Sequence, residues 1–162
     1  MAETLVQPDK LSDSQSEYMK LIAEIMEIRK RGEKPLAYIR TYGCQQNVAD
    51  SEKIKGMLSD SGFDFADSPD NADFILFNTC AVREHAEDRV FGNVGALKNL
   101  KRKHPQILIA LCGCMMEQEH VANRIYKSFP FVGLVFGTHS LHHFPELMYN
   151  SLVNGKRVFE RG

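Results

Sequence analysis

The stretch from Phe74 to Cys80 limits what this chain can fold into more than any other. Its first four residues, Phe74 to Phe77, are all apolar, which is typical of a strand buried on both faces of a parallel sheet. A charged, helix-forming segment begins at Arg83. The pattern therefore predicts a buried strand, a turn that carries the Cys80 thiol, and a helix. In an open parallel sheet, such a turn borders the crevice where ligands bind.

The same succession of strand, cysteine and helix occurs twice more. Residues 36–41 precede Cys44, and residues 107–111 precede Cys112 and Cys114. The alternation predicts an α/β fold: a doubly wound, mostly parallel sheet of about five strands, with helices on both faces and right-handed crossovers. The cysteine-bearing turns should then share one edge of the sheet.

The pattern divides the chain into three segments. Residues 1–33 should form a loose polar tail and then an amphipathic helix that starts near Ser14. Residues 34–152 carry the α/β pattern, including one long helix over about residues 83–103. Residues 153–162 have no partner element in this pattern and are expected to begin a linker, or a strand that leads elsewhere.

Composition bears on which partners the chain can bind and on the compartment in which we expect it. The chain has 162 residues, 43% of them hydrophobic, and a formal net charge of -1, so it has no global basic field that would hold a nucleic acid or an anionic membrane. Neither a signal peptide nor an apolar run near the roughly 18 residues of a spanning helix is present. We expect a cytoplasmic domain without a membrane partner. Its four cysteines then favour ligands or catalytic thiols over disulfides.

The spacing of the cysteines is that of a site built from separate loops. Cys44, Cys80 and Cys114 are each about one βαβ unit apart, roughly 30 or more residues, unlike the short spacings of zinc knuckles and ordinary ferredoxins. Three such thiolates could hold a [4Fe–4S] cluster and leave one iron without a protein ligand. Spacing alone leaves scattered core cysteines or a thiol enzyme open. Cys112 is the better core candidate, provided that Gly113 bends the chain.

Three separated motifs resemble the N-terminal domain of the radical-SAM methylthiotransferases, most closely the tRNA branch that acts on isopentenyl-adenosine. They are Thr41-Tyr42-Gly43-Cys44, Asn78-Thr79-Cys80-Ala81-Val82-Arg83-Glu84 and Cys112-Gly113-Cys114-Met115-Met116. Residues 92–98 and 136–139 are also similar to that branch.

The resemblance implies an auxiliary [4Fe–4S] cluster on Cys44, Cys80 and Cys114 that takes part in sulfur delivery. It also implies a full-length enzyme with a second [4Fe–4S] cluster and S-adenosylmethionine on a radical-SAM domain, followed by a C-terminal RNA-binding domain. That enzyme would convert isopentenyl-adenosine beside the tRNA anticodon to its 2-methylthio derivative. Its expected partners are tRNA and a sulfur or sulfide donor.

The sequence departs from the family in two places. It contains no C-x-x-x-C-x-x-C spacing, so we expect a separate N-terminal domain that is inactive alone and lacks the radical-SAM domain. Gln46 stands where the family has methionine, with little effect expected. The alternative is a non-enzymatic α/β module that binds a ligand or partner and has structural or redox cysteines. Neither G-x-G-x-x-G nor G-x-x-x-x-G-K is present to support a nucleotide site in that module.

Other polar residues have both a functional and a structural interpretation. Arg83 and Glu84 could line the cysteine site or simply open a helix, and Asn47 and Asn78 could bond thiolates, although helix capping is favoured. A basic helix end could contact tRNA phosphates, but a solvated face is favoured. Three histidines lack acidic or cysteine partners at ligand spacing, which favours surface or loop positions. The basic residues are Lys98, Lys101, Arg102 and Lys103, and the histidines are His139, His142 and His143.

Overall fold

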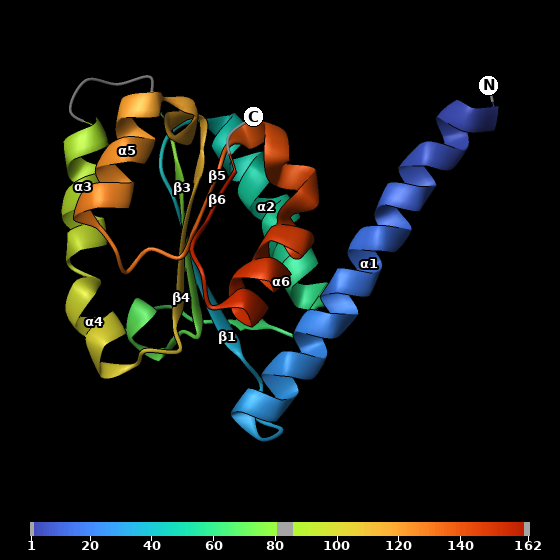
Figure 1. The fold of residues 1–162 in the computed structure, drawn as a ribbon, viewed down its shortest axis with the longest axis horizontal. Helices are drawn as coiled ribbons and strands as arrows, with labels where there is room; N and C mark the ends of the chain where they lie inside the picture. Colours follow the sequence, from blue (N-terminus) through green and yellow to red (C-terminus); the bar gives the residue numbers. More distant parts are fainter. Residues whose placement is uncertain (1, 81–85, 161–162) are drawn as a thin grey trace.

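A six-stranded, all-parallel sheet forms the centre of the fold (Figure 1) in this computed structural model, which describes residues 2–80 and 86–160. The strands lie in the order β2-β1-β3-β4-β5-β6. Their bounds are β1 Leu36–Thr41, β2 Asp64–Phe65, β3 Phe74–Thr79, β4 Leu108–Gly113, β5 Leu134–Phe136 and β6 Val158–Glu160. The predicted α/β class is confirmed, with one strand more than expected.

Helices cover both faces of the sheet in two layers (Figure 1), with α1, α2 and α6 on one face and α3, α4 and α5 on the other. None of the helices in the described part combines the length and the apolar character that a membrane crossing needs. The α-helices are α1 Ala2–Lys30, α2 Gln45–Asp60, α3 Ala86–Gly95, α4 Lys98–Lys103, α5 Glu119–Ser128 and α6 Phe144–Asn154, and the 3₁₀ helices are η1 Pro69–Asn71, η2 Cys114–Glu117 and η3 Thr138–His143.

The two central strands, β3 and β4, are apolar on both sides, so helices must pack on both faces of the sheet. Every residue of each strand is buried, as the apolar runs predicted. Because successive side chains point to opposite faces, Phe74 and Leu76 join the cluster under α2 and α6, whereas Ile75 and Phe77 join the cluster under α3 and α5.

The N-terminal helix starts earlier than the sequence indicated. α1 is continuous from Ala2, in place of a loose tail that ends near Ser14. Ile22 and Met26 anchor its C-terminal half in the core, and an existing helix gains one hydrogen bond for each residue added. The N-terminal part of α1 leads away from the sheet (Figure 1).

The single helix predicted over residues 83–103 is two helices where it is described. α3 ends at Gly95 and α4 begins at Lys98. At the junction, the Leu97 N–H donates to the carbonyl of Val94, only three residues back, at 2.9 Å, and this tight turn buries Leu97. A glycine at the end of α3 favours such a break, because glycine is a poor helix former. The expected start of the helix lies outside the described residues.

The sixth strand, β6, is one that sequence reasoning missed. Val158 pairs with Leu134 and Phe159 pairs with Val135 in parallel register, although residues 153–162 were expected to have no partner element. Three residues of a half-exposed edge strand are too few to show a hydrophobic period.

Arg157 ties β6 to the rest of the domain. Its Nε donates to the Val132 carbonyl at 2.8 Å, and its two terminal nitrogens donate to the carbonyls of Ile125, Tyr126 and Phe129 at the end of α5. The last carbonyls of a helix have few partners within it; here the Ile125 and Phe129 carbonyls also accept from the N–H groups of Phe129 and Val132. One guanidinium therefore connects the end of α5 to the start of β6.

The crossover into β6 differs in hand from its neighbours. α6 lies on the face of α2, whereas the helices of the β3–β4 and β4–β5 crossovers lie on the other face. The β5–α6–β6 connection is therefore of opposite hand, and the expectation of uniform right-handed crossovers is wrong here. α1 holds α6 on this face: the rings of Tyr18 and Tyr149 lie 5.4 Å apart, and the Glu146 N–H donates to Gln15 Oε1 at 3.1 Å.

Candidate metal centre at the carboxyl ends of the strands

Three cysteines gather where the order of the sheet reverses. The chain passes from β1 outward to β2 and then returns to β3, so β1 and β3 flank the switch point at which open α/β sheets bind ligands. Cys44 follows β1, Cys80 follows β3 and Cys114 follows β4. Thr79 and Gly113 are register partners, so Cys80 and Cys114 begin the loops of two neighbouring strands. The expectation of a shared sheet edge is met.

Gly43 allows the first cysteine turn to approach the second. Its φ is +102°, and a Cβ atom there would lie 2.4 Å from the Cβ and 3.1 Å from the Sγ of Cys80. Only glycine combines this left-handed backbone with such a close approach. The backbone before Cys44 therefore packs directly on Cys80.

Cys44 stands at the N-terminus of α2, where a thiolate is favoured. Its side chain is exposed, and the backbone N–H groups of Asn47 and then Gln46 donate toward the sulfur and lower the pKa of the thiol. The neighbouring Cys80 side chain lowers this pKa as well, by the smallest of these contributions. The positive end of the helix dipole acts in the same direction. Cys44 is thus prepared to act as an anionic ligand.

Gly113 separates the two cysteines of the third motif. Its φ is +107°, and a Cβ atom there would lie 2.1 Å from the Thr79 carbonyl oxygen. The bend lets Cys114 open η2, half-buried, with its Sγ 4.0 Å from that same oxygen. Cys112 instead points into the core at 2% exposure, and burial raises the pKa of its thiol. The predicted division between a core cysteine and an edge cysteine is confirmed.

A buried polar network supports the cysteine turns. The Asn47 amide donates to Asn78 Oδ1 at 3.1 Å and to the Thr79 carbonyl at 2.9 Å, and its oxygen accepts from the Cys44 backbone N–H at 3.3 Å. The Asn78 amide donates to the Asn47 carbonyl and to Ser51 Oγ, both at 2.9 Å. The N-cap residue of α2 is Cys44, and Asn47 inside the helix completes a capping box with it and accepts from the Cys44 Sγ at 3.4 Å. Asn47 also joins α2 to the end of β3, whereas Asn78, expected to cap a helix, lies within β3.

Sequence reasoning missed three residues near this edge. Ser51 and Thr41 share a hydrogen bond of 2.7 Å that extends the network, and the signal was the spacing of Asn47 and Ser51, one helical turn apart on α2. Glu117 was also missed. Its Oε1 is buried without a hydrogen-bond partner and lies against Gly137, where an added Cβ would clash with it.

The remaining predicted residues take separate positions. Lys98, Arg102 and Lys103 are exposed on α4. Lys101 turns inward and donates to the carbonyls of Pro105 and Ile107. Arg83 and Glu84 lie outside the described residues.

Within the part of the chain that the structure describes, neither the histidines nor Gln46 belong to a group of side chains that could hold a metal ion. His139 and His142 are exposed, and the rings of His142 and His143 lie 4.0 Å apart. Gln46 donates to Asp50 Oδ1 at 3.0 Å across one turn of α2, beside Cys44 in sequence.

The chemistry of the three thiols fits an iron–sulfur group, although their side chains are not arranged around a common metal position. Among the described residues, no group of three or more His, Cys, Asp or Glu side chains is arranged to hold a metal ion. The edge nevertheless offers three thiols without a disulfide, Cys44, Cys80 and Cys114. One of them has a lowered pKa, and thiolates are the ligands that iron–sulfur clusters take. We conclude that the residues fit such a cluster in chemistry.

Comparison with known proteins gives a family and a consistent set of relatives. Residues 36–137 match the family described as "Uncharacterized protein family UPF0004". A protein of Clostridium perfringens is 48% identical over 135 residues, which cover 83% of this chain and 30% of the relative. One of Caldicellulosiruptor saccharolyticus is 51% identical over 131 residues, covering 81% and 28%. Both are described as tRNA-2-methylthio-N(6)-dimethylallyladenosine synthase. The chain thus spans less than a third of the length of these relatives.

Proposed function

Because the chain belongs to the UPF0004 family, we propose that it is the domain of a tRNA methylthiotransferase that binds an auxiliary [4Fe–4S] cluster and delivers sulfur. The observation that carries this proposal is the meeting of three cysteine-bearing turns at the switch point of the sheet, with Cys44 favoured as a thiolate. The relatives named for a methylthio-adenosine product in tRNA support the substrate class.

The cluster would be held by Cys44, Cys80 and Cys114. When bound, a [4Fe–4S] cluster with three protein thiolates supplies an iron position open to an external sulfur ligand. The protein's own contribution is to prepare the ligands. The N–H groups at the start of α2 stabilise the anionic sulfur of Cys44, and Gly43 lets the turn that carries it lie against Cys80.

The network below the turns keeps these ligands in place. Asn47 bonds both the Cys44 backbone and the end of β3, and the Thr79 hydroxyl donates to the Cys112 carbonyl at 2.7 Å. The ends of β1, β3 and β4 are therefore connected by side-chain bonds as well as by the sheet. A rigid support of this kind fixes the direction of metal ligands.

The rest of the reaction belongs to parts of the relatives that this chain does not span. We assign to those parts a second [4Fe–4S] cluster, S-adenosylmethionine and most contacts with tRNA. The complete enzyme, placed in the cytoplasm, would convert isopentenyl-adenosine next to the anticodon to its 2-methylthio derivative, with sulfur from a sulfide donor. The 162-residue chain alone would not turn over.

A chimera tests this function directly. The chain replaces the segment that it matches in the Clostridium perfringens relative, and mass spectrometry of tRNA nucleosides measures the 2-methylthio product in cells that lack their own enzyme. We expect product from the chimera and from its Cys112→Ala variant, and none from Cys80→Ala. A chimera that is folded and loaded with iron but gives no product would contradict the proposal.

A further inference from the structure

A hollow near the ends of the sheet where β4, β5 and β6 begin is lined by positively charged side chains. It lies between the C-terminal ends of α1 and α6 and the segments that lead into β4, β5 and β6. Four cations line it, Arg29, Lys101, Lys156 and Arg157, and no acidic residue of the described chain does. We call it the basic hollow. Since the chain has a net charge of -1, this is a local concentration of charge.

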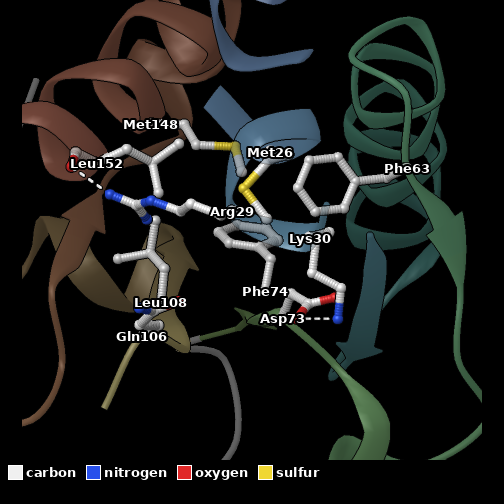
Figure 2. A pocket seen from close by; sticks show the side chains of 10 residues that line it. All are labelled: Met26, Arg29, Lys30, Phe63, Asp73, Phe74, Gln106, Leu108, Met148 and Leu152. Atoms are coloured by element: carbon white, nitrogen blue, oxygen red, sulfur yellow. Dashed lines mark hydrogen bonds and ion pairs between the residues drawn. The ribbon is translucent and has the colours of Figure 1, made fainter. Parts of the chain in front are cut away.

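The cations of the basic hollow are held in place without being neutralised. Arg29 donates to the Leu152 carbonyl at 3.0 Å (Figure 2), and Lys101 and Arg157 also donate to backbone carbonyls. Carbonyls at helix ends offset a cation only in part. None of the four forms an ion pair with a carboxylate in the described part. Figure 2 shows the contrast, since the neighbouring Lys30 pairs with Asp73 at 3.1 Å.

Lys101 in the basic hollow has carbonyl partners but no counter-ion among the described residues. Burial lowers the pKa of the Lys101 ammonium, as expected for a cation withdrawn from water without a counter-ion. The Ser151 Oγ is buried with no hydrogen-bond partner in the structure. A bound oxyanion would compensate the charge of Lys101.

A second hollow borders the basic hollow but is close to neutral. It shares Arg29 and the segment 105–107 with the basic hollow and adds Lys30, Lys103 and His104. Its carboxylates are Asp70 and Asp73, of which Asp73 is already paired. The charges that it adds cancel at neutral pH, so the excess of positive charge is confined to the basic hollow.

We propose that the basic hollow binds a phosphate group of an RNA backbone. The assignment to RNA rests on the proposed function, whereas the assignment to phosphate rests on the four cations that line the hollow without a carboxylate of the described chain. The contact would be independent of base sequence, because it involves only charged groups. It would lie at the edge of the sheet opposite the cysteines, so this domain would hold tRNA away from the site of sulfur delivery.

Fluorescence anisotropy of a short labelled RNA hairpin, titrated with this chain at several salt concentrations, tests the inference. Lys156→Gln and Arg29→Gln remove one charge each, and Lys53→Gln on α2 is the matched control, because Lys53 is also exposed but lies outside the hollow. We expect each hollow variant to bind about 3-fold to 10-fold more weakly and to lower the slope of log K against log[salt] by about 0.7 to 0.9. Equal affinity for the hollow variants and the control would overturn the inference.

A second titration separates RNA from free phosphate. Inorganic phosphate is added to ¹⁵N-labelled chain, and we expect the amide signals of Ser151 and Gly155 to shift only weakly at concentrations where RNA shifts them fully. Saturation by phosphate without RNA binding would overturn the RNA assignment. Iron uptake is measured on the same preparations. A wild-type chain that takes up iron but does not bind RNA counts against this inference alone, whereas a wild-type chain that takes up no iron counts against the proposed function.

Discussion

Gly43 lies directly against Cys80, so that a Cβ atom on Gly43 would come 2.4 Å from the Cys80 Cβ. This contact joins the turn after β1 to the end of β3. It explains how the turn that carries Cys44 comes to lie against Cys80 at the switch point of the sheet.

Gly43→Ala should therefore destabilise the domain and impair the site together. A non-glycine residue at φ +102° costs roughly 1–3 kcal/mol, and the clash with Cys80 adds to this. Urea denaturation measures the loss, and iron content after anaerobic reconstitution reports the site. Gly56→Ala is the matched control. It lies within α2 with open space around it, so we expect about 0.5–1 kcal/mol of stabilisation and full iron uptake.

Asn47→Ala should leave several buried partners unsatisfied. The amide bonds Asn78, the Thr79 carbonyl and the Cys44 N–H, and a buried polar group left without its partner costs about 1–3 kcal/mol. We expect a loss of roughly 2–4 kcal/mol in the free energy of unfolding, measured with urea. The exposed Asn99 on α4 provides the control, since Asn99→Ala should stay within about 0.5 kcal/mol. Similar losses for the two variants would show that the network contributes little.

The four thiols of the metal-free chain should differ in reactivity. Cys44 is exposed and its pKa is lowered by the N–H groups of α2, so its thiolate is populated at a lower pH than that of a free cysteine, whose pKa is about 8.5. Cys112 is buried with a raised pKa. Iodoacetamide labelling across pH, followed by peptide mass spectrometry, should modify Cys44 first and Cys112 only after unfolding. Early labelling of Cys112 would contradict its core position.

Arg157 should be as important to the fold as a core residue. It donates to four carbonyls and lies over the rings of Tyr126 and Phe159. Arg157→Ala should cost about 2–4 kcal/mol, and Arg157→Lys should restore little of it, because an ammonium cannot span the same acceptors. Hydrogen exchange should report faster opening of β6 in both variants. Normal protection of β6 in Arg157→Ala would show that the strand is held by other contacts.

The sequence was most informative where one local pattern determined the structure. The apolar residues of β3 and the cysteine after it predicted a buried strand and its loop, because burial on both faces leaves no alternation. Gly113 likewise predicted the bend that separates Cys112 from Cys114. These are short-range effects of side-chain periodicity and of glycine.

Other features depend on contacts that no local pattern contains. β6 is held by Arg157, whose acceptors lie on α5 and in the loop before β5. The placement of α6 depends on α1, more than a hundred residues away in sequence. The contact of Gly43 with Cys80 arises only after β1 and β3 pair. The positions of the cysteines at the ends of the strands were thus predictable, whereas the contacts that hold the cysteine-bearing turns in place were not.

The central claim is that Cys44, Cys80 and Cys114 bind a [4Fe–4S] cluster, and iron and sulfide content with the visible absorption spectrum tests it most directly. The chain and its four single Cys→Ala variants are reconstituted under anaerobic conditions. We predict about four irons and a broad charge-transfer band for the wild type and for Cys112→Ala, and loss of both in the other three variants. A wild type that takes up no iron, or a Cys112→Ala variant that loses iron while Cys44→Ala keeps it, would contradict this assignment.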